Sequence, residues 1–563
     1  MTEPSDLERI KRASRHLRGT LRESLADPVT GALRPDDVQL LKFHGAYQQD
    51  DRDLREARRL AKLEPGYSFF LRLRLPGGVM SPTQWLAMDA MTQRHGARGL
   101  RLTTRQTIQV HGIRKVDLRA AAQAIHACGL DTIAACGDDN RNVVAAVNPL
   151  LSRVHAQVFE QAQALSLHLR PQSRAWHETW LDEPPSDGNE TEPLLGDAYL
   201  PRKFKIGFAV PPDNDIDVYS QDVGLVASIE DGELTGYDVL VGGGMGATHG
   251  NARTYPRLAS PIGFITPDQV TALAEAALTL QRDHGDRSDR AHARFKYTID
   301  DHGLAWIKAE IERRAGFALQ PSRGFAFTQR GDRFGWREGE NGHWHVGLRI
   351  PFGRVHDKDG VMRQTGMREI AALLVEQAPA AQIRLTPNQN ALVAGLPAGL
   401  RKRVDTLAMQ HDLALHRTGT LLELNTIACV ALPTCGLAMA EAERWMPAFV
   451  PKLQALLDKH GLRNEPIDLR VSGCPNGCSR PYLAEIALIG KAPGRYNLML
   501  GGDHRGQRMN ALYRENIIEP EILASLDELL ARFAAERGAG ERFGDFVVRS
   551  GIVVPPQPRE AAA

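Results

Sequence analysis

The sequence has few aromatic residues, few cysteines and no excess of either charge. Aromatic residues make up 6% of its 563 residues, and 69 Lys and Arg balance 68 Asp and Glu to a net charge of +1. That balance argues against a protein that binds nucleic acid through overall charge, although local basic patches stay open. No uninterrupted apolar run approaches the length of a membrane span. We therefore expect neither nucleic acid nor a membrane as a partner.

The N-terminal residues also lack the layout of a secretory signal, because residues 1–9 have no charged stretch followed by an apolar core. A hydrophobic content of 42% is ordinary for a globular protein, and the length suits three or four domains. We expect a cytoplasmic protein whose thiols stay reduced.

Four of the six cysteines lie in two close pairs, with five residues between the first two and three between the second two: Cys429, Cys435, Cys474 and Cys478. Pro475 and Asn476-Gly477 favour a tight turn that brings the second pair of thiols to one side. A helix predicted over 437–445 would place Cys435 near a helix N-terminus, where the dipole favours the thiolate.

Clustered thiols leave three interpretations open. A disulfide is disfavoured, because the chain has no signature of an oxidising compartment. Zinc knuckles usually have two residues between paired cysteines, whereas the spacing around iron–sulfur clusters varies by family. The spacing therefore favours a four-thiolate iron–sulfur cluster and leaves structural zinc as the alternative. Cys128 and Cys136 are expected to be core or edge residues.

Alternating apolar residues predict strands over 67–75 and 99–111, and helices are predicted over 81–91 and 118–128. The odd-numbered residues of the second strand share one polar, cation-rich face: Arg101, Thr103, Arg105, Thr107, Gln109 and His111. A solvated strand would look similar, but arginines beside His and Gln suit an anion better.

The chain also contains an internal duplication. Residues 384–395 echo 101–112, and residues 347–353 echo 72–78. Only the first copy keeps the charged face, since Gly347, Asn388, Leu392 and Ala394 stand where the first copy has Arg72, Arg105, Gln109 and His111. A weaker echo between 222–246 and 483–502 places Lys203 and Lys205 near the position of the second cysteine pair. Duplication predicts two related halves around one crevice, a natural cofactor site.

The glycine run 242–246 lacks the full spacing of a dinucleotide-binding loop. We therefore expect no nicotinamide or flavin site in this chain, and a reductase built this way needs electrons from a partner.

Long motifs at 434–444, 472–478 and 490–498 resemble the sulfite/nitrite reductase family, most closely the hemoprotein β subunits of NADPH-dependent assimilatory sulfite reductases. The similarity continues through 43–52 and 199–205 in the same order. It implies an enzyme of cysteine biosynthesis that reduces sulfite to sulfide with six electrons. It also implies that the four paired cysteines hold a [4Fe–4S] cluster and that Cys478 is shared with the iron of a siroheme.

The resemblance implies roles for further residues. The anion pocket would be formed by Arg72, Arg141, Lys203 and Lys205. Residues along the siroheme would be Arg101, Thr103, Arg105, Gln109 and His111, with Arg202, Asn388, Gln389 and Asn390 as further candidates and Asn476 at the cluster–siroheme junction.

The resemblance also implies a partner. FAD, FMN and NADPH are expected only on a separate flavoprotein α subunit, with ferredoxin as the alternative donor. Nitrite reduction is the rival activity, which Lys205 disfavours, and a non-catalytic metal protein or redox sensor is the rival from another class.

The implied fold is α+β, with a duplicated pseudo-twofold architecture in five parts. These are an N-terminal arm (1–60), a first ferredoxin-like half-domain (61–150), a first mixed α/β domain for siroheme and substrate (151–335), a second ferredoxin-like half-domain (336–425) and a second mixed α/β domain with the cluster (426–563). Residues 48–52 of the arm have two equally good interpretations: a contact with the catalytic side or a partner, or part of a packed N-terminal extension.

Overall fold

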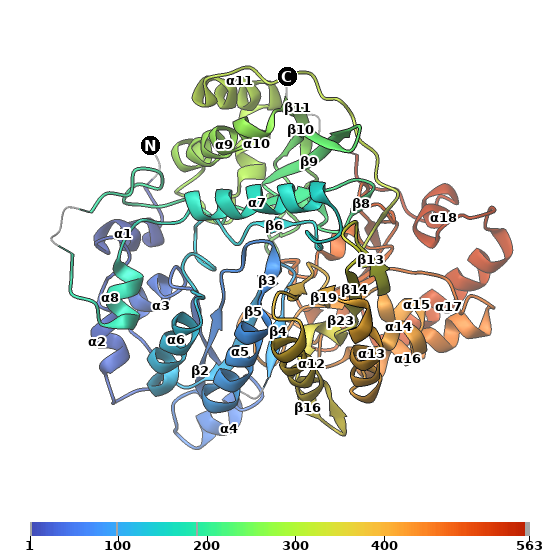
Figure 1. The fold of residues 1–563 in the computed structure, drawn as a ribbon, viewed down its shortest axis with the longest axis horizontal. Coiled ribbons are helices and arrows are strands. Elements are labelled where there is room, and N and C mark those ends of the chain that lie inside the picture. Colours follow the sequence, from blue (N-terminus) through green and yellow to red (C-terminus); the bar gives the residue numbers. More distant parts are fainter. Residues whose placement is uncertain (1–2, 97–98, 187–189, 558–563) are drawn as a thin grey trace.

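The computed structural model describes residues 3–96, 99–186 and 190–557, shown in Figure 1. Within them, four five-stranded sheets of two kinds account for most strands. Two short pairs complete the set: β8 (Asp213–Asn214) with β12 (Gln329–Arg330), and β16 (Asp357–Lys358) with β17 (Val361–Met362).

Two of the sheets belong to the ferredoxin-like half-domains. The first runs in the order β1 (Ala46–Asp50), β2 (Tyr67–Arg72), β5 (Ile108–Ile113), β4 (Leu100–Leu102) and β15 (Arg354–Val355). The second runs β13 (Gly335–Glu338), β14 (Trp344–Leu348), β19 (Ala391–Leu396), β18 (Gln382–Leu385) and β3 (Val79–Met80). The first sheet therefore extends into the segment predicted as an arm.

Each half-domain gives a two-residue edge strand to the sheet of the other. β3 and β15 follow equivalent 3-10 turns, Pro76–Gly78 and Pro351–Gly353. Arg354 pairs with Arg101 at one junction, and Val79 pairs with Arg384 at the other. Arg101 and Arg384 are equivalent positions of the internal repeat. The exchange of edge strands between the half-domains therefore follows the same pseudo-twofold symmetry as the sequence duplication.

The two mixed sheets share one topology, in which three parallel strands are followed by two antiparallel ones. The first contains β6 (Val144–Ala145), β7 (Ile206–Ala209), β9 (Val223–Glu230), β10 (Glu233–Val241) and β11 (Ser260–Ile265). The second contains β20 (Thr426–Ala428), β21 (Leu469–Ser472), β22 (Ile486–Ala492), β23 (Arg495–Leu500) and β24 (Ala511–Ile517).

These sheets correct the position expected for the two lysines. Val223 donates its N–H to the carbonyl of Lys205, as Ile486 donates to that of Asp468. Lys205 is therefore equivalent to Asp468 and precedes its strand, whereas the second cysteine pair follows its strand. The weak sequence echo was wrong here because its register rested on glycines rather than on strand pairing.

Helices cover the sheets in both halves. The first half has α1 (Asp6–Ala13), α2 (Leu21–Ala26), α3 (Pro35–Leu40), α4 (Arg55–Leu60), α5 (Pro82–His95), α6 (Leu118–Ala127), α7 (Arg153–His168), α8 (Ala175–Leu181), α9 (Val270–His284), α10 (Phe295–His302) and α11 (Leu304–Ala315). The second half has α12 (Arg363–Gln377), α13 (Arg401–Gln410), α14 (Leu415–Thr418), α15 (Leu421–Leu424), α16 (Met446–Lys459), α17 (Glu519–Glu536) and α18 (Phe543–Arg549).

The helices predicted over 81–91 and 118–128 are confirmed as α5 and α6. Ser81 caps α5 in a capping box with Gln84, as its sequence indicates. α5 packs against its counterpart α12, which joins the half-domains on their outer side (Figure 1).

The stretch 99–111, predicted as one strand, is a hairpin instead. β4 and β5 pair antiparallel, with Arg101 opposite Gln109. Thr103 stabilises the turn, because its N–H donates to the Thr107 carbonyl (2.9 Å) and its hydroxyl accepts from the Arg105 N–H (3.2 Å). Since position 101 faces 109 across the hairpin, the odd-numbered side chains still share one face.

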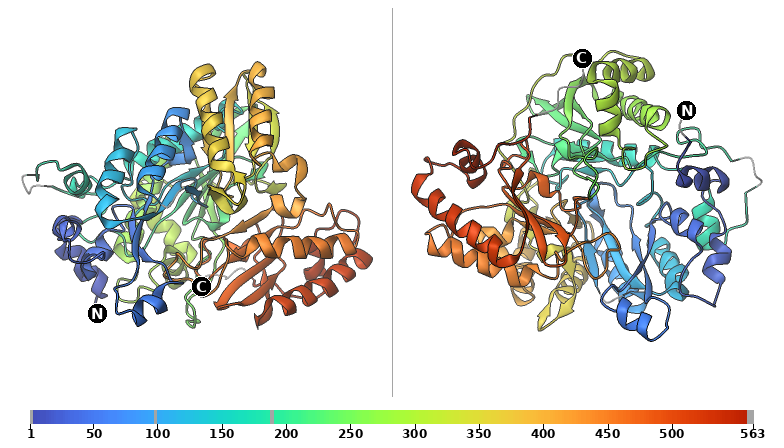
Figure 2. Two further views of the ribbon diagram at one scale, coloured as in Figure 1. Left: turned by 90° about the horizontal axis from the view of Figure 1, so that it is seen from below. Right: turned by 180° about the vertical axis from the view of Figure 1, so that it is seen from behind.

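The two largest of four buried apolar clusters in the described part of the chain divide it between them. One draws its residues from between Ile10 and Ala414, and the other from between Leu422 and Val553. Figure 2 accordingly shows the C-terminal part, orange to red, as a lobe beside the rest. Over the described residues, no helix has both the length and the apolarity needed to span a bilayer.

Candidate cofactor and anion site

The two cysteine pairs meet because they follow neighbouring parallel strands. Cys429 comes directly after β20, and Cys474 comes two residues after β21. Cys429 donates its N–H to the Val471 carbonyl (3.1 Å), while Gly473 donates its N–H to the Cys429 sulfur (3.2 Å). The carboxyl ends of these strands thus bring both loops to one edge of the sheet.

The predicted turn between the second pair is present. Gly477 donates its N–H to the Cys474 carbonyl (3.4 Å) and has a φ of +66°. Cys474 is buried, whereas Cys478 is exposed. The turn therefore buries one sulfur and leaves the other open.

The four thiols influence one another electrostatically. Burial raises the pKa of the Cys429 thiol well above its usual range, and the Cys478, Cys474 and Cys435 sulfurs raise it further. Burial and Cys478 likewise raise the pKa of Cys474 to about 12, although amide groups of Asn476 oppose the shift. Thiolates gathered in this way need positive charge among them, which a metal centre supplies.

A cluster fits this donor set better than a single ion does. Four soft thiolates and an N–H bond to sulfur suit iron–sulfur chemistry.

The helix predicted over 437–445 is absent, and α16 begins only at Met446. Met439 and Ala440 donate their N–H groups to the Gly473 carbonyl, and Glu443 donates its N–H to the Cys429 carbonyl. These bonds to the cysteine loops replace the bonds of a helix. Cys435 consequently does not lie at a helix N-terminus.

The N-terminal segment touches the first cysteine loop. Arg52 donates its N–H to the Pro433 carbonyl (3.2 Å), and its guanidinium reaches the Cys435 carbonyl (3.4 Å).

The glycine run 242–246 packs on the second cysteine turn. Ala247 donates its N–H to the Pro475 carbonyl (2.9 Å). A Cβ on Gly246 would lie 3.0 Å from the Asn476 carbonyl, and one on Gly477 would lie 2.4 Å from the Met245 carbonyl. The glycine run lets its backbone approach the backbone of the second cysteine turn closely. This contact was not predicted from the sequence, although consecutive glycines are typical of close backbone packing.

The cationic face crosses the first half-domain sheet in one row. Arg72 on β2 pairs with Gln109 on β5, which pairs with Arg101 on β4. Arg141 joins from a loop: its guanidinium and that of Arg72 both reach the Ala135 carbonyl, at 3.4 and 3.5 Å. The Nε atom of Arg72 is buried without a hydrogen-bond partner among the described residues. Arg72 and Arg141, both predicted for the anion site, therefore lie side by side, and the Arg72 Nε–H is available to donate to a ligand.

Lys203 and Lys205 lie on the segment that leads into β7. Burial lowers the pKa of both lysines well below the usual range; Arg202 lowers that of Lys203 further, and Arg294 that of both. No hydrogen bond or ion pair of either ammonium group is found within the described residues. Burial lowers the pKa of neighbouring Arg105 to about 9 in the same way. Such a concentration of unneutralised cations is stabilised by a bound anion.

Comparison with known proteins accords with this geometry. The description "Nitrite/Sulfite reductase ferredoxin-like half domain" matches residues 61–128 and 337–406, and "Nitrite and sulphite reductase 4Fe-4S domain" matches residues 160–319. The sulfite reductase [NADPH] hemoprotein beta-component of Xanthomonas oryzae pv. oryzae strain PXO99A is 59% identical over 98% of this chain and 97% of its own. The chain belongs to the sulfite and nitrite reductase family.

Other relatives agree. The protein of the same name from Xylella fastidiosa strain M12 is 56% identical over 98% of this chain and 97% of its own. The structure of the Mycobacterium tuberculosis NirA protein superimposes with a TM-score of 0.78 at 23% identity, over 97% of both chains, which shows a shared fold. The predicted α+β reductase fold is thus confirmed.

Residues 160–319, which match the 4Fe-4S domain of the family, contain none of the paired cysteines. The match falls on the first mixed domain because it shares its topology with the second. In this reductase the thiols belong to the second copy alone.

Several residues predicted along the cofactor also form hydrogen bonds or ion pairs within the protein. Arg101 binds Glu443 (2.8 Å) and the Ala428 carbonyl (3.1 Å). Gln389 donates to the Ala428 carbonyl (2.8 Å), and Arg202 lies 3.6 Å from Asp138. Asn388 and Asn390 both donate to Asp332, at 2.8 and 2.6 Å. These contacts fix the directions of their side chains.

His111 has one ring nitrogen that is available for a further hydrogen bond. Its Nδ1 lies 3.3 Å from the Gln49 side chain, and its Nε2 is buried without a partner among the described residues. Burial holds the pKa of His111 well below its usual range, so the ring is neutral.

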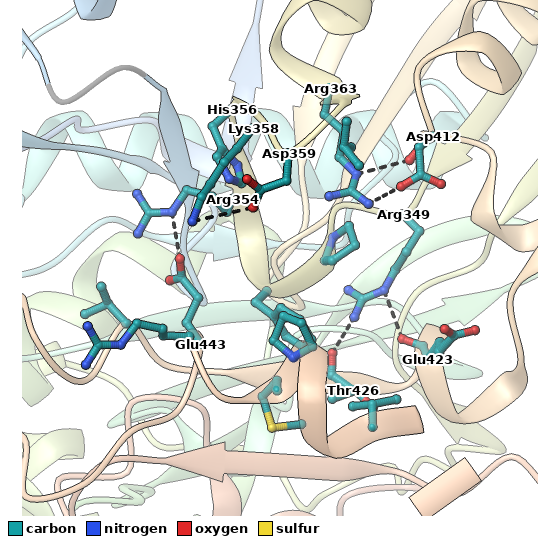
Figure 3. Close-up of a pocket in the computed structure, with 18 of the residues that line it drawn as sticks. Arg349, Arg354, His356, Lys358, Asp359, Arg363, Asp412, Glu423, Thr426 and Glu443 are labelled. Carbon is teal, nitrogen blue, oxygen red and sulfur yellow. Dashed lines mark hydrogen bonds and ion pairs between the residues drawn. The ribbon is translucent and has the colours of Figure 1, made fainter. Parts of the chain in front are cut away.

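A pocket of about 810 Å³ lies beside the first cysteine loop (Figure 3). Leu432 and Pro433 line it on the loop side, and Phe352 lines it on the half-domain side. Glu443, in its wall, accepts from Arg101 (2.8 Å) and Arg354 (2.7 Å). None of the four residues predicted for the anion pocket lines it. It is a separate feature of the cluster-bearing half.

Proposed function

We propose that this protein reduces sulfite to sulfide with six electrons. The proposal rests on one observation: four converging thiols lie near a group of cations, and two of these, Lys203 and Lys205, have no hydrogen-bond or ion-pair partner in the part of the chain that the structure describes. The relatives named sulfite reductase support it.

The thiol side chains are the groups that would hold the cofactors. Cys429, Cys435, Cys474 and Cys478 would hold the [4Fe–4S] cluster. Cys478 would be shared with the iron of a siroheme, which its exposed side chain supports. When bound, the pair supplies electrons singly at an iron open to substrate.

The chain's own part is to bind, orient and protonate the substrate. Arg72 and Arg141 would hold oxyanion oxygens with forked donors, and Lys203 and Lys205 would add point charge. Since burial and neighbouring cations depress the pKa of both lysines, their ammonium groups are ready proton donors. Oxygen would depart from sulfur as water after this protonation, assisted by the surrounding positive charge.

Electrons would come from a separate flavoprotein carrying FAD and FMN and oxidising NADPH. The relatives' designation as NADPH-dependent beta-components supports such a partner, with ferredoxin as the alternative. Titrating the purified chain with the flavoprotein or with ferredoxin, and measuring the affinity for each, distinguishes the two electron donors.

The activity is tested with the purified chain and a chemical electron donor. Siroheme and cluster absorption bands are expected, together with a higher kcat/KM for sulfite than for nitrite. A colourless protein would contradict the enzyme proposal, and faster turnover of nitrite would reassign the substrate.

A further inference from the structure

Arg480 lies where the two half-domains and the two mixed domains meet. It belongs to the second mixed domain, two residues after Cys478, and its side chain is 7% exposed. Its Nη1 donates to the Thr104 carbonyl (3.2 Å) in the first half-domain, and its Nη2 donates to the Pro387 carbonyl (2.9 Å) in the second. Thr104 and Pro387 are equivalent in the repeat, so one guanidinium joins both turns.

The fourth part is reached through Asp217 of the first mixed domain. Arg480 donates from Nε to its Oδ2 atom (2.6 Å), and Arg470 donates to the same oxygen (2.5 Å). The loops 210–222 and 473–485 have the same length between equivalent strands, which makes Asp217 the counterpart of Arg480. Both adopt left-handed backbone conformations before a 3-10 turn, with φ of +50° and +54°. The pair therefore lies across the pseudo-twofold axis.

The contacts of Arg480 fix the turn that carries Cys478. The Arg480 N–H donates to the Gly477 carbonyl (2.9 Å), and Thr104 donates its hydroxyl to the Cys478 carbonyl (2.9 Å). Thr104 is thus bound twice, once by Cys478 and once by Arg480. A buried guanidinium without these acceptors would be costly, so the fork and the turn stabilise each other.

We propose that Arg480 is a positioning residue whose forked contacts hold the Cys478 turn against the three other parts and so set where the Cys478 sulfur lies relative to the cations of the first half. The inference rests on the proposed function only for the identity of the group that Cys478 binds. Lysine cannot replace this role, since an ammonium group is a single point of charge, while the fork serves the Thr104 and Pro387 carbonyls and Asp217 in fixed directions.

Three variants of the full-length chain separate position from charge. Arg480→Lys keeps the charge and loses the fork, while Arg480→Gln loses both. The matched control is Arg74→Lys: Arg74 is also a buried arginine, 5% exposed, whose guanidinium donates to the Ser166 carbonyl (2.6 Å), and it makes no contact with the cysteine turns.

The first readout is amide hydrogen exchange over residues 473–485. Arg480→Lys and Arg480→Gln should speed exchange there at least about tenfold, whereas Arg74→Lys should not. The second readout is the midpoint potential of the metal centres. In both Arg480 variants it should shift by about 59 mV for one electron, which corresponds to a tenfold change in the ratio of reduced to oxidised protein at a fixed potential.

Arg480→Lys with wild-type exchange and wild-type potential would overturn the proposal. So would full rescue of the potential by Lys after its loss in Gln, because charge alone would then suffice. If the Arg480 variants do not fold, Asp217→Ala decides: it removes the acceptor of Nε and should speed exchange over 473–485, and unchanged exchange would contradict the proposal. Absence of siroheme and cluster bands in the wild type would defeat the proposed function, while the exchange experiment would still test Arg480.

Discussion

The two mixed domains share one topology and carry opposite charges at equivalent places. Lys205 in the first corresponds to Asp468 in the second, and Asp217 corresponds to Arg480. Asp215 takes the place of Cys478, and burial raises the pKa of that carboxyl to about 8. One copy thus carries the cluster of cations, and the other carries the thiols. Under the proposed function, this divergence would separate substrate binding from electron transfer.

The largest expected effect tests the thiol side of this comparison. Cys478→Ser should lower sulfite reduction at least about 1,000-fold, because loss of an outer-shell partner alone costs about 10- to 100-fold. The siroheme and cluster bands should change together, as both centres would share this sulfur. Steady-state rates and absorption spectra measure the outcome.

Cys128→Ser is the matched control, because Cys128 is a half-buried thiol that only donates to the Ile125 carbonyl (3.1 Å). It should leave spectra and rates near wild type. A Cys478→Ser protein with both centres intact would refute the shared ligand.

The cation side is tested by Lys205→Gln. It removes one of two ammonium groups that lack a protein partner, and kcat/KM for sulfite should fall about 100- to 1,000-fold. The fall should be smaller for nitrite, which carries less charge, so the ratio of the two kcat/KM values reports the role directly.

Lys115→Gln controls for loss of a buried lysine, because Lys115 donates to the carbonyls of Asp27, Thr30 and Ala32 at 2.8 to 3.0 Å. Lys115→Gln should lower the free energy of unfolding and leave the ratio of kcat/KM for sulfite to kcat/KM for nitrite unchanged. Equal losses for sulfite and nitrite in Lys205→Gln would argue against a charge-selective lysine.

A third difference between the halves is the N-terminal segment, which His44 anchors to the first half alone. His44 Nε2 lies 3.0 Å from the Leu17 carbonyl, and Trp180 donates to its Nδ1 (3.1 Å). Burial lowers the pKa of His44 to about 4 from the usual 6.5. Because the unfolded chain takes up this proton first, stability present above pH 6.5 should be lost as the pH falls toward 4, by about 3 kcal/mol.

His44→Gln should flatten this acid-side loss, since the variant has no proton to take up there. Urea unfolding at pH 7 and pH 5 gives both free energies. An identical difference between the two pH values in wild type and variant would exclude His44 as the source.

The features predictable from the sequence were those carried by short, continuous motifs. The cysteine pairs, the turn at Pro475 and the cap at Ser81 depend on neighbours within a few residues. The hairpin at 99–111 escaped prediction because one hydroxyl, that of Thr103, turns an alternating strand back on itself. The missing helix at 437–445 and the ion pair between Asp217 and Arg480 depend on partners far along the chain, which no local pattern encodes.

The smallest expected effect concerns the pocket beside the first cysteine loop. In the first half, α7 packs against the equivalent turn, where a Cβ on Gly77 would lie 2.7 Å from the Phe159 ring. The second half has Phe352 at this position, with a φ of +55°, and its ring lines the pocket. Gly77→Ala should therefore cost about 2 kcal/mol or more, from overpacking and left-handed strain together.

Phe352→Gly should change the free energy of unfolding by less than about 1 kcal/mol. Relief of left-handed strain offers about 1–2 kcal/mol, while loss of a half-buried ring costs about half of the roughly 1.5–3 kcal/mol for full burial. The two effects nearly cancel, so chemical unfolding should scarcely distinguish the variant from wild type. A destabilisation well above about 2 kcal/mol would mean that the ring supports the second core as Phe159 supports the first, and the two halves would then differ in shape but not in how this turn is held.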